Sequence, residues 1–121
     1  MAGIAIGNAD TTIDNGADVT SSVGATAELA TITGNATSLF TAADTSAQAA
    51  TKAVTAAGLI LGGAVAAGGT KILAFDDGTN TAVFRFTSAA NDTSILATEL
   101  TLIGIIMGTA VTVVADYAFI A

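Results

Sequence analysis

The sequence contains no histidine, cysteine, proline or tryptophan in its 121 residues. Histidine and cysteine supply most near-neutral proton transfer, thiol nucleophiles and soft metal ligands in proteins. Hydroxyl side chains are abundant, but no histidine can serve them as a base, and neither Lys52 nor Lys71 stands in a Ser-x-x-Lys motif. These absences predict that the protein is not an enzyme.

Basic residues are scarce as well, with three Lys and Arg against ten Asp and Glu and a net charge of −7. A nucleic-acid surface needs clustered cations, so the sequence excludes a nucleic-acid partner. The same charge disfavours docking on anionic lipid. The longest uncharged run, residues 53–70, is broken by glycines and holds few large apolar groups, so we expect membrane contact only where a cell surface serves as an attachment site.

Small apolar residues are what the chain has in plenty, since 52% of its residues are hydrophobic and only 5% are aromatic. A chain of this length is expected to form one domain, residues 1–121, and to leave a large share of that apolar surface uncovered. Large exposed apolar patches mark interaction sites. The composition therefore predicts a protein that packs against other copies of itself.

The chain divides into three parts by local pattern. Residues 1–40 are rich in Thr, Ala and Gly, with short alternations that predict strands. Residues 42–57 are Ala-rich and free of glycine, which predicts one helix that Thr41 or Asp44 caps and Gly58 ends. Ala43, Ala47, Ala50 and Val54 are expected to share one face of this helix. Residues 58–121 form a third part with hairpin and strand patterns.

The clearest pattern in the third part is a β-hairpin. Residues 71–75 and 81–87 are mainly apolar segments on either side of the turn formers Asp76–Asn80. Leu73 and Phe75 are expected to meet Ala82, Phe84 and Phe86 across the pair. Further strands are predicted at residues 99–103 and 110–114. The expected fold is mainly β, a β-sandwich or a meander of short antiparallel strands, with one Ala-rich helix near 42–57.

Two acidic loops are candidate calcium sites. Asp76, Asp77 and Asn80 offer adjacent carboxylates and an amide oxygen, and Asp92 and Glu99 fall at ligand positions of a degenerate twelve-residue loop. The alternatives are a solvated hairpin turn in the first case and a polar connection that caps the next element in the second. We favour these alternatives, and Ca²⁺ is the only cofactor that the pattern suggests.

The C-terminal end of the sequence has an acid followed only by uncharged residues, at Asp116, Tyr117, Phe119 and Ile120. Together with the helix, the aromatic hairpin, the acidic loop and the Glu99–Gly104 segment, it resembles the C-terminal domains of type I-secreted bacterial surface-layer and RTX-like proteins. The GGxGxD repeats of that family are absent. The resemblance implies export and assembly outside the cell, and the size and composition are also similar to those of a self-assembling appendage subunit such as spinin.

These features predict an extracellular structural protein at the bacterial cell surface, with its own copies as partner in a filament, tube or surface layer. The apolar, glycine-broken segment 59–69 is the expected contact between copies, through Leu59, Ile60, Leu61 and Val65. Two alternatives stay open. One is a binding module, either a calcium-dependent adhesin or an ice-binding surface of Thr rows, and the other is a membrane-resident coat protein of the filamentous-phage type.

Overall fold

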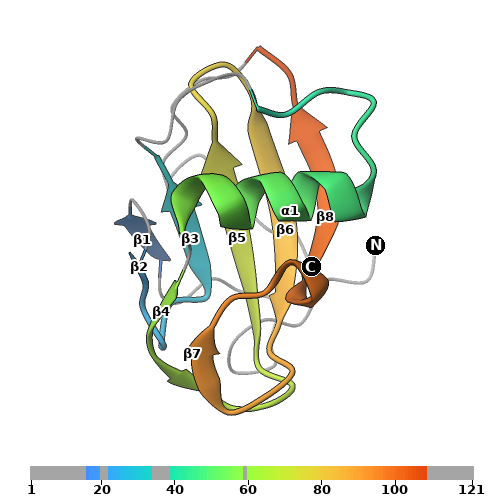
Figure 1. Cartoon of the computed structure of the whole chain (residues 1–121). Helices are drawn as coiled ribbons and strands as arrows, with labels where there is room; N and C mark the ends of the chain where they lie inside the picture. Colours follow the sequence, from blue (N-terminus) through green and yellow to red (C-terminus); the bar gives the residue numbers. More distant parts are fainter. Residues whose placement is uncertain (1–15, 20–21, 34–38, 59, 109–121) are drawn as a thin grey trace, which may run out of the picture.

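The computed structural model describes residues 16–19, 22–33, 39–58 and 60–108 (Figure 1). Within these ranges the chain forms eight strands, one α-helix and one 3₁₀ turn. Their bounds are β1 Gly16–Val19, β2 Ser22–Val23, β3 Leu29–Ile32, α1 Ser46–Ala57, β4 Ile60–Val65, β5 Thr70–Asp76, β6 Thr81–Thr87, β7 Asp92–Ser94, η1 Ala97–Glu99 and β8 Leu100–Ile106. None of the described helices has the length and apolarity needed to cross a membrane.

The described strands form two sheets, one of five strands in the order β1-β3-β5-β6-β8 and one of three in the order β2-β4-β7. The prediction of a mainly β fold with one helix is confirmed. The pairing differs from a purely antiparallel meander, because β1, β3 and β5 are parallel while β5, β6 and β8 are antiparallel. Parallel neighbours need a crossover, and the connection from β3 to β5 supplies one that contains α1 and β4.

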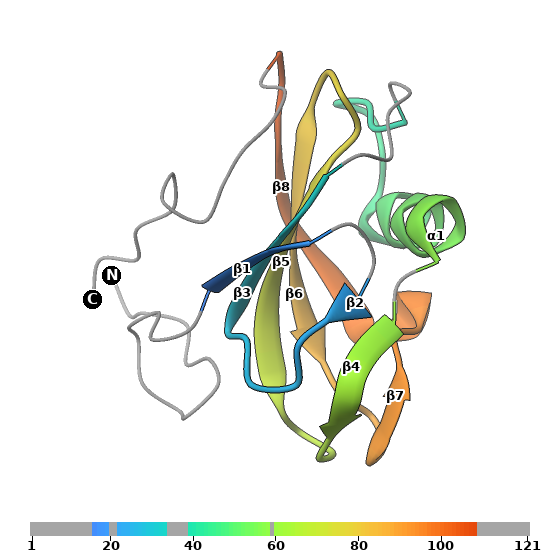
Figure 2. The same cartoon turned by 90° about the vertical axis from the view of Figure 1, so that its left-hand side faces the viewer.

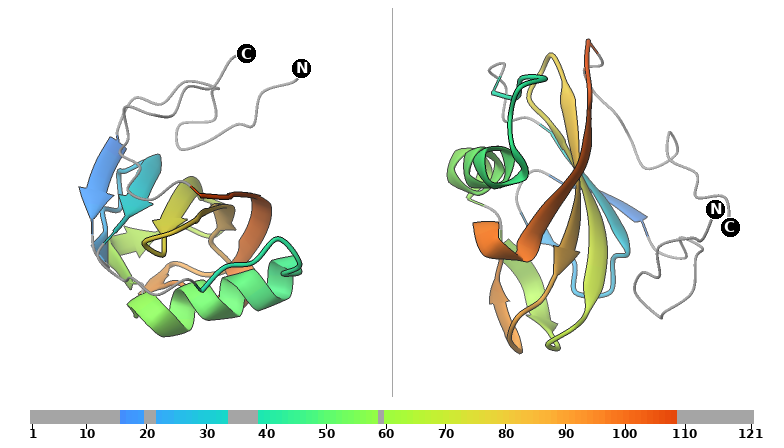
Figure 3. Two further views of the ribbon diagram at one scale, coloured as in Figure 1. Left: turned by 90° about the horizontal axis from the view of Figure 1, so that it is seen from above. Right: turned by 90° about the vertical axis from the view of Figure 1, so that its right-hand side faces the viewer.

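The core lies between the five-stranded sheet on one side and α1 with the three-stranded sheet on the other (Figures 2 and 3). The hairpin prediction is confirmed, since β5 pairs with β6 in the register Leu73↔Phe84 and Phe75↔Ala82. The alternate side chains of both strands enter the core. Phe40, which precedes the helix, packs edge-on against Phe75 with ring centroids 5.3 Å apart.

The helix begins at Ser46, later than predicted. Thr45 caps its N-terminus, because the Thr45 hydroxyl accepts a hydrogen bond from the backbone of Gln48 and the Gln48 side chain accepts one from the backbone of Thr45. Asp44 instead accepts from the Thr41 backbone and forms an ion pair with Lys52 at 2.8 Å. The predicted C-terminal end is confirmed, with Gly58 in the left-handed conformation at φ 55°.

The buried face of α1 agrees with the predicted one at Ala50 and Val54 but not at the other two predicted positions. Ala49, Ala50 and Ala53 are fully buried against the core, whereas Ala47 is exposed and Ala43 lies outside the helix. Because these three residues carry only a methyl group, the helix can lie close to the sheet.

Candidate functional site

The acidic turn between β5 and β6 is a structural clamp. The side chain of Asp77 is fully buried. One of its carboxylate oxygens accepts a hydrogen bond from the backbone N–H of Phe40 at 2.8 Å, and the other accepts from the N–H groups of Thr79 and Asn80 at 2.9 and 2.7 Å. Burial by itself would raise the pKa of Asp77, but these backbone donors outweigh it and hold the pKa below its usual value.

Asn80 extends the clamp to two distant segments. Its side-chain amide donates to the carbonyl of Phe40 at 3.0 Å, and its side-chain oxygen accepts from the backbone N–H of Gly108 at 2.8 Å. Asp76 accepts from the N–H of Gly78 at 2.6 Å, within the turn itself. The polar atoms of this turn therefore tie the loop before α1, the β5–β6 hairpin and the end of β8 together.

The second pair of candidate calcium ligands makes local caps. Asp92 accepts from the backbone N–H of Ser94 at 2.9 Å. Glu99 is buried, and its two oxygens accept from the N–H groups of Ala89 at 2.8 Å and Leu96 at 2.9 Å. Both carboxylates thus satisfy backbone donors in the polar connection between β6 and β8.

The two candidate calcium loops lie at opposite ends of the sheet. Six residue steps of the β5–β6 ladder, from the pair Asp76↔Thr81 to the pair Thr70↔Thr87, separate them, which corresponds to about 20 Å. Among the described residues no group of three or more acidic side chains is arranged to hold a metal ion. The arrangement matches the turn and capping interpretations of both loops.

Part of the segment expected to form contacts between copies belongs to the core of the single chain. Leu61 is buried in the core, and Val65 packs against it. Ile60 belongs to β4, which is the middle strand of the three-stranded sheet, and pairs with Ser22 and Ser94. The assignment of Leu61 to an assembly surface is therefore wrong, because reaching a second copy would require opening the core. Leu59 lies outside the described residues, as do Asp116, Tyr117, Phe119 and Ile120.

An apolar surface occurs at strand β8. It is an edge strand, since β6 is the one described strand that pairs with it. Ile103, Ile106 and Met107 are 49%, 42% and 54% exposed, which makes them three of the four large hydrophobic side chains exposed in the described part of the chain. Residues 100–108 contain no charged residue. The fourth exposed side chain, Leu96, is 52% exposed and lies before the 3₁₀ turn.

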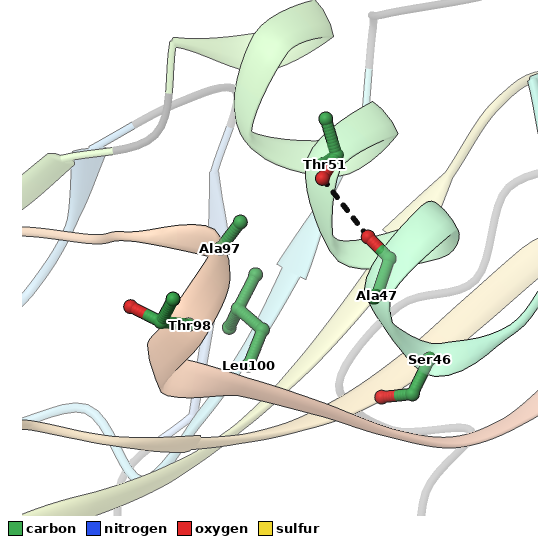
Figure 4. Close-up of a pocket in the computed structure, with 6 residues that line it drawn as sticks. All are labelled: Ser46, Ala47, Thr51, Ala97, Thr98 and Leu100. Carbon is green, nitrogen blue, oxygen red and sulfur yellow. Dashed lines mark hydrogen bonds between the residues drawn. The ribbon is translucent and has the colours of Figure 1, made fainter.

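A shallow pocket of about 350 Å³ lies beside the start of β8, between α1 and η1 (Figure 4). Its lining is Ser46, Ala47, Thr51, Ala97, Thr98 and Leu100. The Thr51 hydroxyl donates to the carbonyl of Ala47 within the helix, and the Ser46 hydroxyl accepts from the backbone N–H of Leu102 at 2.9 Å. With no ionisable side chain in its lining, this pocket offers no acid, base or charged ligand group.

Comparison of the chain with protein-family models, with curated protein sequences and with solved structures finds no match. A function can therefore be proposed only from the geometry of the described residues. The most distinctive feature of that geometry is the apolar edge strand β8.

Sequence reasoning predicted a strand near β8 but missed its position at the edge. The sequence feature that could have indicated an exposed edge strand is the uncharged run Leu100–Gly108. Such a run is also typical of a strand buried on both faces. Local pattern could not distinguish the two cases, because strand order depends on pairing between distant segments.

Proposed function

We propose that the protein is an extracellular structural subunit that self-assembles into a filament, tube or surface layer. The observation that carries this proposal is the uncharged edge strand β8 with its exposed Ile103, Ile106 and Met107. An exposed apolar edge presents unpaired backbone groups that another chain can join, and natural proteins that stay monomeric protect such edges with charges, proline or β-bulges. No charge or proline occurs between Leu100 and Gly108, and the register shift against β6 leaves Gly104–Ile106 regularly paired beyond it.

The sequence supports the location outside the cell. The chain has no cysteine and carries a net charge of −7, and its C-terminal pattern resembles that of type I-secreted surface proteins. A net charge of −7 makes copies of the chain repel each other, and this repulsion is weakest where two uncharged surfaces meet. Assembly would therefore be directed to those surfaces.

Calcium has no part in the proposed assembly. Asp77 and Glu99 already accept hydrogen bonds from backbone N–H groups with both of their carboxylate oxygens. A calcium ion needs six to eight oxygen ligands, and among the described residues no group of three or more acidic side chains is arranged to supply them. We expect assembly to proceed equally with calcium and with a chelator.

The test is size-exclusion chromatography followed by negative-stain electron microscopy of the purified full chain, over a range of concentrations and with or without calcium. Assemblies with a regular repeat are the expected result. The variant Ile106→Lys should reduce the assembled fraction at least tenfold, because it places a cation on the apolar edge.

The matched control is Leu96→Lys, which adds the same charge at a similarly exposed leucine away from β8. This variant should assemble like the wild type. Monomers alone at every concentration would overturn the proposed function. Equal losses in both variants would show that the edge is not the surface that matters.

A further inference from the structure

The path of the chain after β8 leaves the outer side of this strand uncovered as far as Gly108. The backbone N–H of Gly108 donates to the side chain of Asn80, which directly precedes the first residue of β6. Thr81 at that position pairs with Ile106. A turn at Met107 and Gly108, with Gly108 at φ 72°, follows the strand, and this hydrogen bond holds the turn beside the start of β6.

The outer side of β8 is not uniform along its length. Near Leu100–Leu102 the Ser46 hydroxyl accepts the outward backbone N–H of Leu102, and a register shift against β6 follows at this point. Ile103 is the extra residue at this shift, and beyond it Gly104–Ile106 meets no described element on its outer side. Gly104 within this half has open space where a Cβ would stand, so another backbone can approach closely there.

Charge decides which surface of a second copy fits this half of the strand. Two copies with a net charge of −7 repel each other, so a close contact needs an uncharged surface on both sides. Of the other described edge strands, β1 contains Asp18, β7 contains Asp92 and β2 has only two residues. Strand β8 contains no charged residue, and an uncharged apolar strand is complementary to a copy of itself.

We propose that β8 pairs antiparallel with β8 of a second copy across a two-fold axis near Ile103–Ile106, so that the two five-stranded sheets continue into one another. This inference rests on the proposed function and deepens it, because it names one of the contacts of the assembly. A two-fold contact closes on itself, so the polymer grows through a second, different surface of the resulting dimer.

The absence of cysteine makes a direct test straightforward, since any cysteine that is introduced is the sole thiol in the chain. Ile103→Cys, Ile106→Cys and the control Leu96→Cys are made in the full chain and oxidised mildly at equal protein concentrations. Residues near a two-fold axis meet their own copies, so at least one of the two β8 variants should form disulfide-linked dimers at least fivefold faster than Leu96→Cys. Non-reducing electrophoresis measures these rates.

Two outcomes would overturn the pairing. In the first, the protein forms regular polymers, but neither β8 variant cross-links faster than Leu96→Cys. The proposed function would then stand without this contact. The other is efficient cross-linking within single monomers of a double variant, Ile103→Cys with Val113→Cys, which would show that residues 109–121 of the same copy occupy the edge. Rapid β8 dimers without any polymer would instead support the pairing and overturn the proposed function.

Discussion

Strands β5 and β8 lie on the two sides of β6, and they are alike in local terms. Each has seven residues, each is antiparallel to β6, and each is mostly apolar. Yet six of the seven residues of β5 are buried, whereas β8 has buried, half-buried and exposed positions. In β5 Leu73 and Phe75 face the core, and Ile72 and Ala74, which alternate with them, are fully buried as well.

The difference between these strands follows from strand order. β5 lies inside the sheet because β3 pairs with it on the side away from β6, through a parallel ladder. No described strand does the same for β8. Composition makes both strands suitable for an interior position, but only one of them has neighbours on both sides within the described chain. Apolar side chains at β8 therefore stay exposed in the described part of the chain.

The largest contrast is expected when side chains of equal size are shortened in the two strands. Leu73→Ala should lower the free energy of unfolding by about 2–5 kcal/mol, because it opens a cavity in the core. Ile103→Ala should cost less than about 1 kcal/mol, because that side chain is half exposed. Chemical denaturation at a concentration where the protein is monomeric measures both, and equal losses would contradict the comparison.

A substitution of Asp77, in the turn that follows β5, should have a smaller effect on the free energy of unfolding. Asp77→Asn should lower the free energy of unfolding by about 1–3 kcal/mol, because an amide replaces one oxygen acceptor with a donor and a buried N–H group loses its partner. The matched control is Asp92→Asn, at a carboxylate with one hydrogen bond in a partly exposed position, which should cost at most about 0.5 kcal/mol.

At acid pH, the difference in the free energy of unfolding between Asp77→Asn and the wild type should become smaller. The native pKa of Asp77 lies below the value of 3.8 expected in the unfolded chain. Its stabilisation is therefore fully present above that value and is lost as the pH falls through the native pKa. A constant difference down to the acid transition would contradict the role given to the carboxylate.

The smallest effect on stability is expected from the titration of Lys71, the basic residue within β5. Lys71 is buried, and its ammonium group donates to the carbonyls of Ala25 and Ala27 at 2.6 and 2.5 Å. Burial lowers the pKa of Lys71, although the charge of Glu28 partly opposes the shift. The unfolded chain consequently binds this proton more strongly than the native one.

This difference predicts a stability that rises with pH between the native pKa of Lys71 and the unfolded value of 10.5. Urea denaturation at several pH values up to 10.5 measures the rise. Lys71→Met removes the titrating group and should flatten the profile. A variant whose profile is as steep as that of the wild type would assign the pH dependence to another group.

The sequence predicted those parts of the fold that depend on neighbours along the chain. The β5–β6 hairpin follows from two mainly apolar segments on either side of five turn-forming residues, and the end of the helix follows from Gly58. The start of the helix was misplaced because Thr41, Asp44 and Thr45 are all competent caps, and the reciprocal bond with Gln48 selects Thr45.

Features that depend on distant segments could not be predicted in this way. The parallel ladder between β3 and β5 joins residues about forty positions apart, and nothing in either strand specifies the other as its partner. For the same reason the apolar segment around Leu61 was interpreted as surface, although β2 and β7 enclose it, and the edge position of β8 was missed.

The hydrogen bonds of Asn80 also bear on the order of folding. They join residues 40 positions earlier and 28 positions later in the chain, and such non-local contacts form slowly because long loops must close first. The β5–β6 hairpin needs only its own five-residue turn and can form early. The bond from Gly108 to Asn80 requires a separation of 28 residues to close, so we expect it, and with it the end of β8, to become fixed after the hairpin has formed.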